Sequence, residues 1–130
     1  MSTVLPILKL RQCLITSLHR HLEDEEVSRF ESELLEQVDR HEATFVIVDV
    51  CALEILDTYM TRILGGLGKS CWMMGARLVL CGLQPEVAIT MVEMRQSIAG
   101  VIPANDLEHA MEIVEAHGQD SKLGGLLAGI

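Results

Sequence analysis

The chain has 130 residues, 49% of them hydrophobic, and a formal net charge of -9. Such a length forms one domain with a single core, which buries about two-thirds of the surface of the unfolded chain. The charge argues against nucleic acid as a partner, because a phosphate backbone would be repelled. No apolar run approaches the roughly 20 residues that cross a bilayer, and the N-terminus lacks a signal-peptide pattern. We therefore expect a cytoplasmic protein that does not contact membranes.

The first half of the chain is expected to form a hairpin, a helix and a buried strand. Two short apolar segments, 5–10 and 13–18, flank two polar residues, a pattern that favours strands joined by a tight turn. Apolar residues recur every three or four positions over 23–41, which predicts an amphipathic helix with an acidic first turn. The β-branched run 43–50 predicts a buried central strand.

The second half of the chain alternates helices with strands. Helical apolar spacing predicts a helix from Thr58 to Trp72, and Gly75 suits a left-handed stop behind it. The apolar run 76–83 predicts another buried strand. A third helix is expected over 84–94, where a proline occupies the first turn.

The last elements complete an α/β fold. The segment 100–104 predicts a short edge strand, and Asn105 and Glu108 have the spacing of a capping pair at the start of a fourth helix. This order of elements predicts a mostly parallel, mixed sheet with right-handed crossovers. Residues 1–118 are expected to form the domain. Residues 119–130 form a Gly-rich tail that is expected to be loose, with docking on a partner as the alternative.

A glycine-rich stretch and a strand-end aspartate are the first candidates for chemistry. The stretch LGGLGK lacks the spacing of a phosphate-binding loop, and Gly65, Gly66 and Gly68 fall inside a predicted helix. Close helix packing is the favoured explanation for these glycines. Asp49 could be a phosphoacceptor, but the first strand carries no acidic residues to hold magnesium. A structural role, in which Asp49 bonds to nearby amides, is therefore expected.

The cysteines and histidines do not form a metal-binding pattern. The four cysteines stand apart without a CxxC pair, and those in apolar surroundings, such as Cys51 and Cys81, are expected to be buried thiols in a reducing compartment. His19 and His21 have a spacing that could serve a metal, but no second pair accompanies them. We expect neither a metal nor a cofactor.

The dipeptide Asp57-Thr58 stands at the start of the second predicted helix. Either side chain could cap this helix by accepting a hydrogen bond from a backbone amide, a contribution of about 1 kcal/mol. A cap needs only one of the two side chains. The other would lie at the rim of the sheet, where strand-to-helix loops of open α/β folds carry function. The hydroxyl of Thr58 would then be accessible to a partner.

The segment VDVCALEILDTYMTRILGGLG resembles the central part of STAS domains (sulfate transporter and anti-sigma-factor antagonist). In that family a buried strand leads to Asp-Ser or Asp-Thr at a helix start, and residues 5 to about 117 fit the fold in order. The segment is most similar to the small single-domain STAS subunit of bacterial stressosomes. In this subunit the hydroxyl residue is followed by an aromatic residue, an arginine and a leucine, as are Thr58, Tyr59, Arg62 and Leu64 here.

The start of the first predicted helix supports the same resemblance. The small stressosome subunit is acidic there, whereas its larger paralogues have a second phosphorylatable threonine. Glu23 and Asp24 occupy this position here, so a single phosphosite is expected. There are two departures from the family pattern: the acceptor is threonine where serine is common, and the tail after His117 has no matching counterpart.

The resemblance implies a non-enzymatic scaffold and antagonist that sequesters a switch Ser/Thr kinase, in a homo-oligomer or a large assembly with sensor-bearing STAS paralogues. Stress would activate the kinase, which would phosphorylate Thr58 and depart to start a stress-response branch. Asp57 would orient the loop, while Tyr59 and Arg62 would lie beside the phosphosite and meet the partner or the phosphate. Two alternatives stay open: a free anti-sigma-factor antagonist that binds an anti-sigma kinase directly, and an enzyme that uses Asp57 or a cysteine.

Overall fold

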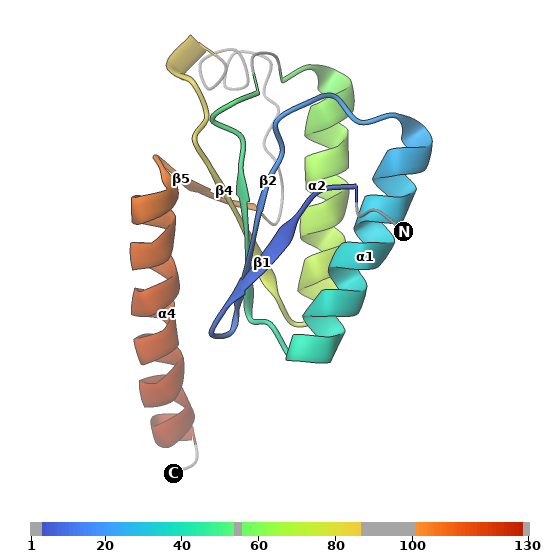
Figure 1. Cartoon of the computed structure of the whole chain (residues 1–130). Helices are drawn as coiled ribbons and strands as arrows, with labels where there is room; N and C mark the ends of the chain where they lie inside the picture. The colour runs from blue at the N-terminus through green and yellow to red at the C-terminus, as the bar shows by residue number, and fades with distance from the viewer. Residues whose placement is uncertain (1–3, 54–55, 87–100, 129–130) are drawn as a thin grey trace.

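The computed structural model describes residues 4–53, 56–86 and 101–128, which form a five-stranded sheet flanked by helices (Figure 1). The strands are β1 (Ile7–Leu10), β2 (Cys13–Ser17), β3 (Phe45–Asp49), β4 (Arg77–Cys81) and β5 (Val101–Ala104). The helices of the described residues are α1 (Asp24–His41), α2 (Thr58–Met73) and α4 (Leu107–Ala128). The α/β class that the sequence predicts is confirmed.

The strands lie in the order β1-β2-β3-β4-β5, and only the first pair is antiparallel. Across the hairpin, Leu10 pairs with Cys13, and Arg11 in the turn has a φ of 58°. The central strand is β3, and its residues from Phe45 to Val48 are all buried. The predicted hairpin, the mostly parallel sheet and the central strand are therefore confirmed.

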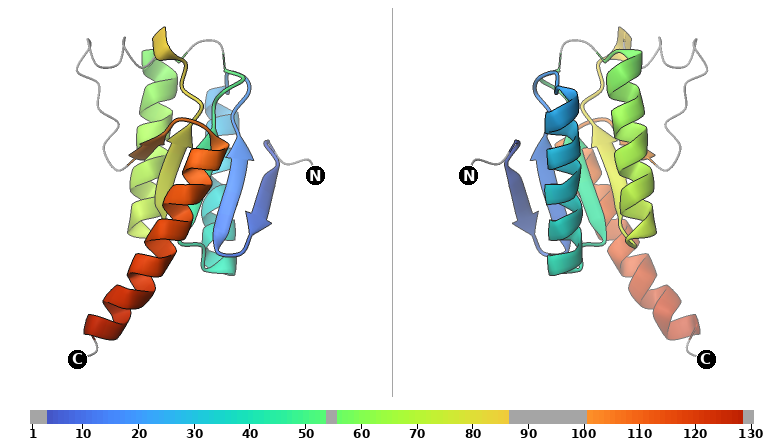
Figure 2. Two further views of the ribbon diagram at one scale, coloured as in Figure 1. Left: turned by 90° about the vertical axis from the view of Figure 1, so that its left-hand side faces the viewer. Right: turned by 90° about the vertical axis from the view of Figure 1, so that its right-hand side faces the viewer.

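Helices cover both faces of the sheet, as Figure 2 shows. On one face, α1 and α2 contribute Leu34 and Leu64 to a core that includes Val46 of β3. On the other face, Ala110 of α4 belongs to a second cluster, which includes Ile47 of β3. Because neighbouring residues of a strand point to opposite faces, a strand covered on both sides is apolar throughout. This double cover explains the continuous apolar run of β3.

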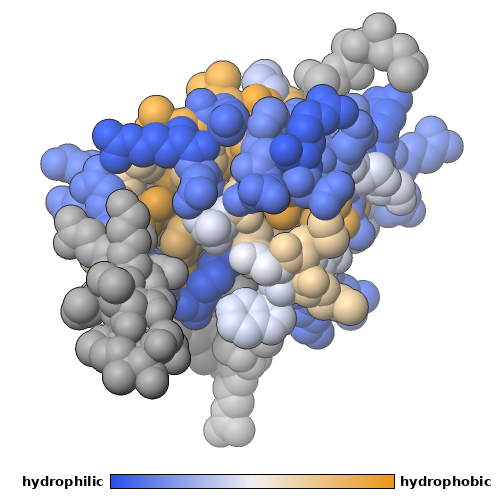
Figure 3. All heavy atoms as spheres, turned by 90° about the horizontal axis from the view of Figure 1, so that it is seen from below, coloured by the Kyte–Doolittle hydropathy of each residue, from blue (hydrophilic) through white to orange (hydrophobic). Residues whose placement is uncertain are grey.

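The end of the molecule at which α2 stops carries exposed apolar side chains. Trp72 is 61% exposed and Met73 is 86% exposed, while the guanidinium of Arg77 lies 5.5 Å from the centroid of the Trp72 ring. Seen from below, hydrophobic and pale atoms interrupt an otherwise hydrophilic surface (Figure 3). Gly75 has a φ of 86°, which confirms the predicted left-handed stop behind α2.

The last helix is longer than the sequence pattern predicts. The backbone of α4 continues to Ala128, whereas a loose tail is expected from residue 119. A helix that is already nucleated gains one hydrogen bond for each added residue, and 118–128 contains no proline to stop it. The third predicted helix is described only at Pro85 and Glu86, which are helical, and its remainder lies outside the described residues.

Close packing does not explain all the glycines of α2. Gly68 is buried, but Gly66 is exposed, and a Cβ atom added to Gly66 would meet no atom within 4 Å. The packing explanation is therefore wrong for Gly66, because this residue lies on the solvent side of the helix.

Candidate functional site

The candidate site lies where the parallel strands end and two helices begin. The chain passes from β2 into α1 and from β3 into α2, so the N-termini of both helices lie at the carboxyl edge of the sheet (Figure 1). Loops at this edge carry function in open α/β folds, and helix N-termini favour negative charge. The fold thereby brings the predicted phosphosite near the acidic position at the head of α1.

Asp57 is the N-cap of α2. Its backbone is extended, with φ of -85° and ψ of 178°, and its Oδ1 atom accepts a hydrogen bond from the backbone N–H of Met60 at 2.9 Å. The hydroxyl of Thr61 donates to the backbone carbonyl of Asp57, also at 2.9 Å. The cap is therefore supplied by Asp57, which decides between the two side chains that the sequence leaves open.

Thr58 is the first residue of α2, and it is exposed. Its hydroxyl makes no hydrogen bond to another described residue, so neither the cap nor the packing of this part of the chain requires it. Arg62 lies one turn further along the helix, where it is exposed and forms no ion pair with the described residues. Both side chains are accessible, while phosphorylation of Thr58 and the role of Arg62 stay predictions.

Tyr59 joins the start of α2 to the start of α1. Its hydroxyl donates a hydrogen bond to Oδ1 of Asp24 at 2.6 Å, across 35 positions of sequence. The ring of His21 stacks on the Tyr59 ring, with centroids 5.1 Å apart and planes inclined by 25°. The hydrogen bond to Asp24, aided by desolvation and nearby acidic charges, raises the pKa of Tyr59 to about 12. The phenol is therefore protonated at neutral pH and can act as the donor.

Charged contacts hold the loop that precedes α1. Two nitrogens of Arg20 lie 3.1 and 2.6 Å from the two carboxylate oxygens of Glu26. The same carboxylate accepts a hydrogen bond from the backbone N–H of Glu23, the N-cap residue, at 3.2 Å. These hydrogen bonds, the one from Arg20 first, lower the pKa of Glu26 to about 2. The acidic position at Glu23 and Asp24 therefore has a defined place at the head of α1.

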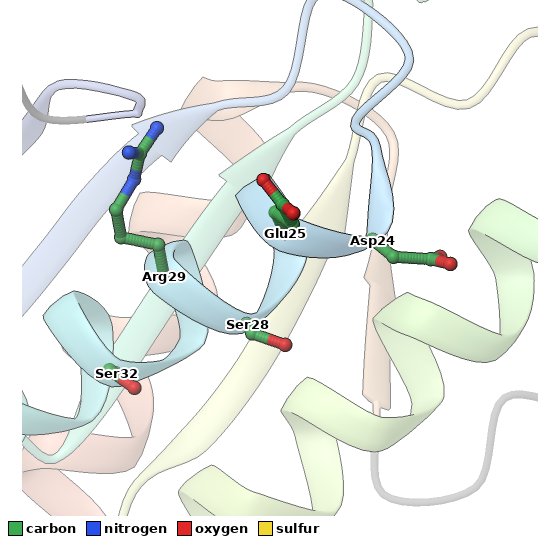
Figure 4. A pocket seen from close by; sticks show the side chains of 5 residues that line it. All are labelled: Asp24, Glu25, Ser28, Arg29 and Ser32. Carbon is green, nitrogen blue, oxygen red and sulfur yellow. The ribbon is translucent and has the colours of Figure 1, made fainter.

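A shallow depression on α1 adjoins this position. Five side chains of this one helix line it, namely Asp24, Glu25, Ser28, Arg29 and Ser32 (Figure 4). In the close view, the side chains of Asp24 and Ser28 point toward α2. Enclosed, mostly apolar cavities are typical of small-molecule sites, whereas this depression is open, and charged and hydroxyl-bearing residues line it. Its shape suits contact with a macromolecule better than retention of a small ligand.

Asp49 has the structural role that the sequence predicts, since its Oδ1 accepts a hydrogen bond from the backbone N–H of Cys51 at 2.9 Å. Cys51 itself is exposed, so the expectation of a buried thiol is wrong there, because the chain has left the strand and turns at this residue. Cys13, Cys71 and Cys81 are buried. Desolvation raises the pKa of Cys71 to about 11, which makes this thiol unreactive at neutral pH.

Within the part of the chain that the structure describes, no group of three or more His, Cys, Asp or Glu side chains could hold a metal ion. His21, considered from its spacing as a metal ligand, instead packs on Tyr59.

None of the helices described in 4–53, 56–86 and 101–128 is long and apolar enough to cross a membrane.

The contact between Tyr59 and Asp24 has no signal in the sequence. The pattern assigns the two residues to different helices as separate site residues, and it gives no reason to add His21 to them. The sequence signal is weak: an aromatic residue, Tyr59, follows the start of one helix, and an acidic residue, Asp24, stands at the start of another.

Comparison with known proteins agrees with this architecture. The family model described as STAS domain matches residues 6–98. RsbRA of Bacillus subtilis (strain 168), described as an RsbT co-antagonist protein, is 25% identical over 91 residues, which amount to 70% of this chain and 33% of RsbRA. The chain thus spans about a third of the length of that relative.

This chain is similar to two solved structures over almost their full lengths. RsbS of Moorella thermoacetica, in a variant with one serine replaced by glutamate, has a TM-score of 0.75 and 29% identity, covering 88% of this chain and 97% of that one. A chain from the molecular architecture of the stressosome, described as a signal integration and transduction hub, has the same TM-score and identity, covering 87% and 98%.

Proposed function

The chain belongs to the STAS domain family, and we propose that it is a non-catalytic regulatory protein that sequesters a Ser/Thr protein kinase in the cytoplasm. The kinase leaves when it has phosphorylated Thr58, and it then starts a stress-response branch through a sigma factor or a related pathway. Larger, sensor-bearing STAS paralogues are the proposed partners in a large assembly. The similarity to RsbS and to a stressosome chain, over nearly their full lengths, supports this proposal.

One observation carries the proposal: Asp57 caps α2, and the adjacent hydroxyl of Thr58 has no structural task among the described residues. A threonine that served as the cap would have its hydroxyl occupied by a backbone amide. Here the carboxylate of Asp57 accepts that bond at 2.9 Å, and Thr58 is exposed at the first helical position. A protein kinase can therefore reach this hydroxyl without unfolding the helix.

A phosphate on Thr58 would suit the fold but disturb the contact with the kinase. The dipole and free amides at the start of α2 favour the added charge of about -1.5 to -2. The nearby surface is already acidic, since Asp57, Asp24 and Glu23 are all exposed. A partner surface matched to a neutral hydroxyl would have to desolvate the new charge or meet it with like charge. The resulting loss of affinity releases the kinase.

A pull-down of the cognate kinase, with and without ATP, tests the proposal. Thr58→Ala is expected to fold and capture the kinase but to retain it when ATP is added, because no phosphate can form. Thr58→Asp is expected to fold but to capture the kinase poorly. Thr61→Ala is the matched control on the same helix, since the Thr61 hydroxyl is bonded to the carbonyl of Asp57 and should not affect release.

Two outcomes would contradict this function. If ATP releases the kinase from Thr58→Ala as readily as from the wild type, or if both Thr58 variants unfold in a thermal melt, Thr58 is not the switch. The protein incubated with ATP alone should gain no phosphate, because the kinase supplies the catalysis. Size-exclusion chromatography with a larger STAS paralogue then distinguishes the proposed large assembly from a free antagonist, which would form only a small complex with the kinase.

A further inference from the structure

Contacts on both sides of Thr58 hold the start of α2, one within the helix and one to the head of α1. On one side, the carboxylate of Asp57 accepts the hydrogen bond from the backbone of Met60. On the other side, the hydroxyl of Tyr59 donates to Asp24 at 2.6 Å, and the ring of His21 covers the Tyr59 ring. The backbone that carries the Thr58 side chain is thus held by its own helix and by the head of α1.

Asp24, which accepts the bond from Tyr59, lies in a segment at the head of α1 that is held by further hydrogen bonds. The bidentate pair of Arg20 and Glu26, together with the hydrogen bond that the backbone N–H of Glu23 donates to Glu26, holds the residues that surround Asp24. Bonds from a hydroxyl to a carboxylate are shorter and stronger than bonds between neutral groups. The distance of 2.6 Å between Tyr59 and Asp24 lies in that short range. The pKa of Tyr59, raised to about 12, keeps the donor proton in place at any physiological pH.

We propose that the Tyr59–Asp24 pair is a latch that positions the Thr58 hydroxyl for phosphoryl transfer. The inference rests on the proposed function of Thr58 as the phosphoacceptor. In that step, Oγ1 of Thr58 forms a bond to the γ-phosphorus of ATP, and the bond from that phosphorus to the bridging oxygen of the β-phosphate breaks. ADP leaves, and a basic group of the kinase takes the hydroxyl proton. Tyr59 and Asp24 are positioning residues, because neither touches the transferred group.

Preorganisation is the physical reason for an effect on rate. An acceptor that is already oriented reaches the reactive geometry without a further loss of conformational freedom, whereas a mobile acceptor must first be ordered. Loss of the latch should therefore reduce kcat for phosphorylation of Thr58 by about twofold to tenfold, the range expected for one hydrogen bond. KM should change little in a variant that removes only the Tyr59 hydroxyl, whereas loss of the exposed Asp24 carboxylate also alters the surface that the kinase meets.

A double-mutant cycle measured with purified kinase and ATP tests the latch. Tyr59→Phe keeps the ring and its stacking on His21 but removes the hydroxyl, and Asp24→Ala removes the acceptor. If the two groups act through one bond, each single variant and the double variant should lose kcat by the same factor. Asp24→Asn retains an oxygen that can accept the bond and should restore most of kcat. Glu112→Gln removes an exposed carboxylate of α4 as a charge-matched control.

A second readout needs no kinase. Tyr59 is the single tyrosine of the chain, so ionisation of its phenol can be followed by ultraviolet absorbance. At about pH 11 the wild-type phenol should be mostly protonated, whereas a clearly larger fraction should be ionised in Asp24→Ala, because the bond to Asp24 is the largest cause of the raised pKa. Identical titrations of the two proteins would overturn the latch.

The kinetic measurements distinguish a failure of the latch from a failure of the proposed function of Thr58. If wild-type Thr58 takes phosphate and Tyr59→Phe takes it with the same kcat, the latch is wrong and the proposed function stands. If the losses of the two single variants multiply in the double variant, the residues act independently and the latch is wrong. If wild-type Thr58 takes no phosphate at all, the proposed function fails and the latch fails with it.

Discussion

Gly82 approaches Asp49 so closely, where β4 and β3 end, that no side chain fits between them. A Cβ atom on Gly82 would lie 2.8 Å from Oδ1 of Asp49 and 2.8 Å from the backbone nitrogen of Cys51. The φ of Gly82 is 85°, a conformation that residues with a side chain rarely adopt. The glycine therefore allows the ends of two neighbouring strands to pack together at the edge of the sheet that carries the site.

Gly82→Ala should destabilise the protein, because it combines a strained φ with a clash against backbone atoms. The strain alone costs about 1–3 kcal/mol, and the clash adds to it. Gly66→Ala is the matched control: it lies inside a helix with open space around it and should be neutral or stabilise by up to about 1 kcal/mol. Urea unfolding measures both changes. Equal stability of the two variants would show that the strand ends relax more freely than the structure indicates.

Leu64→Ala should destabilise the domain strongly. Leu64 is completely buried in the core between α2 and the sheet, and removal of its side chain leaves a cavity that costs about 2–5 kcal/mol. Ile63→Ala should cost less, because Ile63 is only partly buried. The two midpoints in a thermal melt provide the comparison, and an unshifted melt of Leu64→Ala would contradict the packing of α2 described here.

Full treatment with the kinase should add one phosphate, on Thr58. Ser28 and Ser32 are exposed on α1, so accessibility alone would not protect them. They lie inside a regular helix, however, whereas Thr58 begins one and adjoins a strand-to-helix loop. Glu23 and Asp24, at the head of α1, offer no hydroxyl. Mass spectrometry of the intact protein and of its peptides would decide, and equal occupancy of a serine of α1 would contradict a single site.

One of the four cysteines should react much faster than the other three with a thiol reagent in the native protein. Cys51 is exposed, whereas the other three are buried and have their pKa raised mainly by desolvation. The carboxylate of Asp49 raises the pKa of Cys51 as well, so its thiolate should be scarce at neutral pH. Asp49→Asn removes that charge, which lowers the pKa and should speed labelling. Stopped-flow absorbance would give both rates, and a second fast thiol in the native state would contradict the burial.

Local sequence patterns were enough to predict the fold class and the order of the elements, and they placed the candidate site at the start of α2. These features depend on local patterns, such as the spacing of buried residues along α2 and the continuous apolar run of β3, a strand that is covered on both faces. An Asp-Thr pair directly before a helical stripe also marks a helix start without any knowledge of its neighbours. For the same reason Gly75 could be assigned as the stop behind α2, since the required conformation follows from its place after the last apolar turn.

The roles of the individual side chains at that helix start became clear from the three-dimensional arrangement alone. Capping by Asp57 depends on side-chain direction, which residue spacing does not specify, and it leaves Thr58 exposed. The bond between Tyr59 and Asp24 joins residues 35 positions apart, and no periodicity encodes such a meeting. The exposure of Cys51 likewise depends on where the chain turns after β3. Contacts between distant segments and the directions of individual side chains arise only when the sheet assembles and brings the helix starts together.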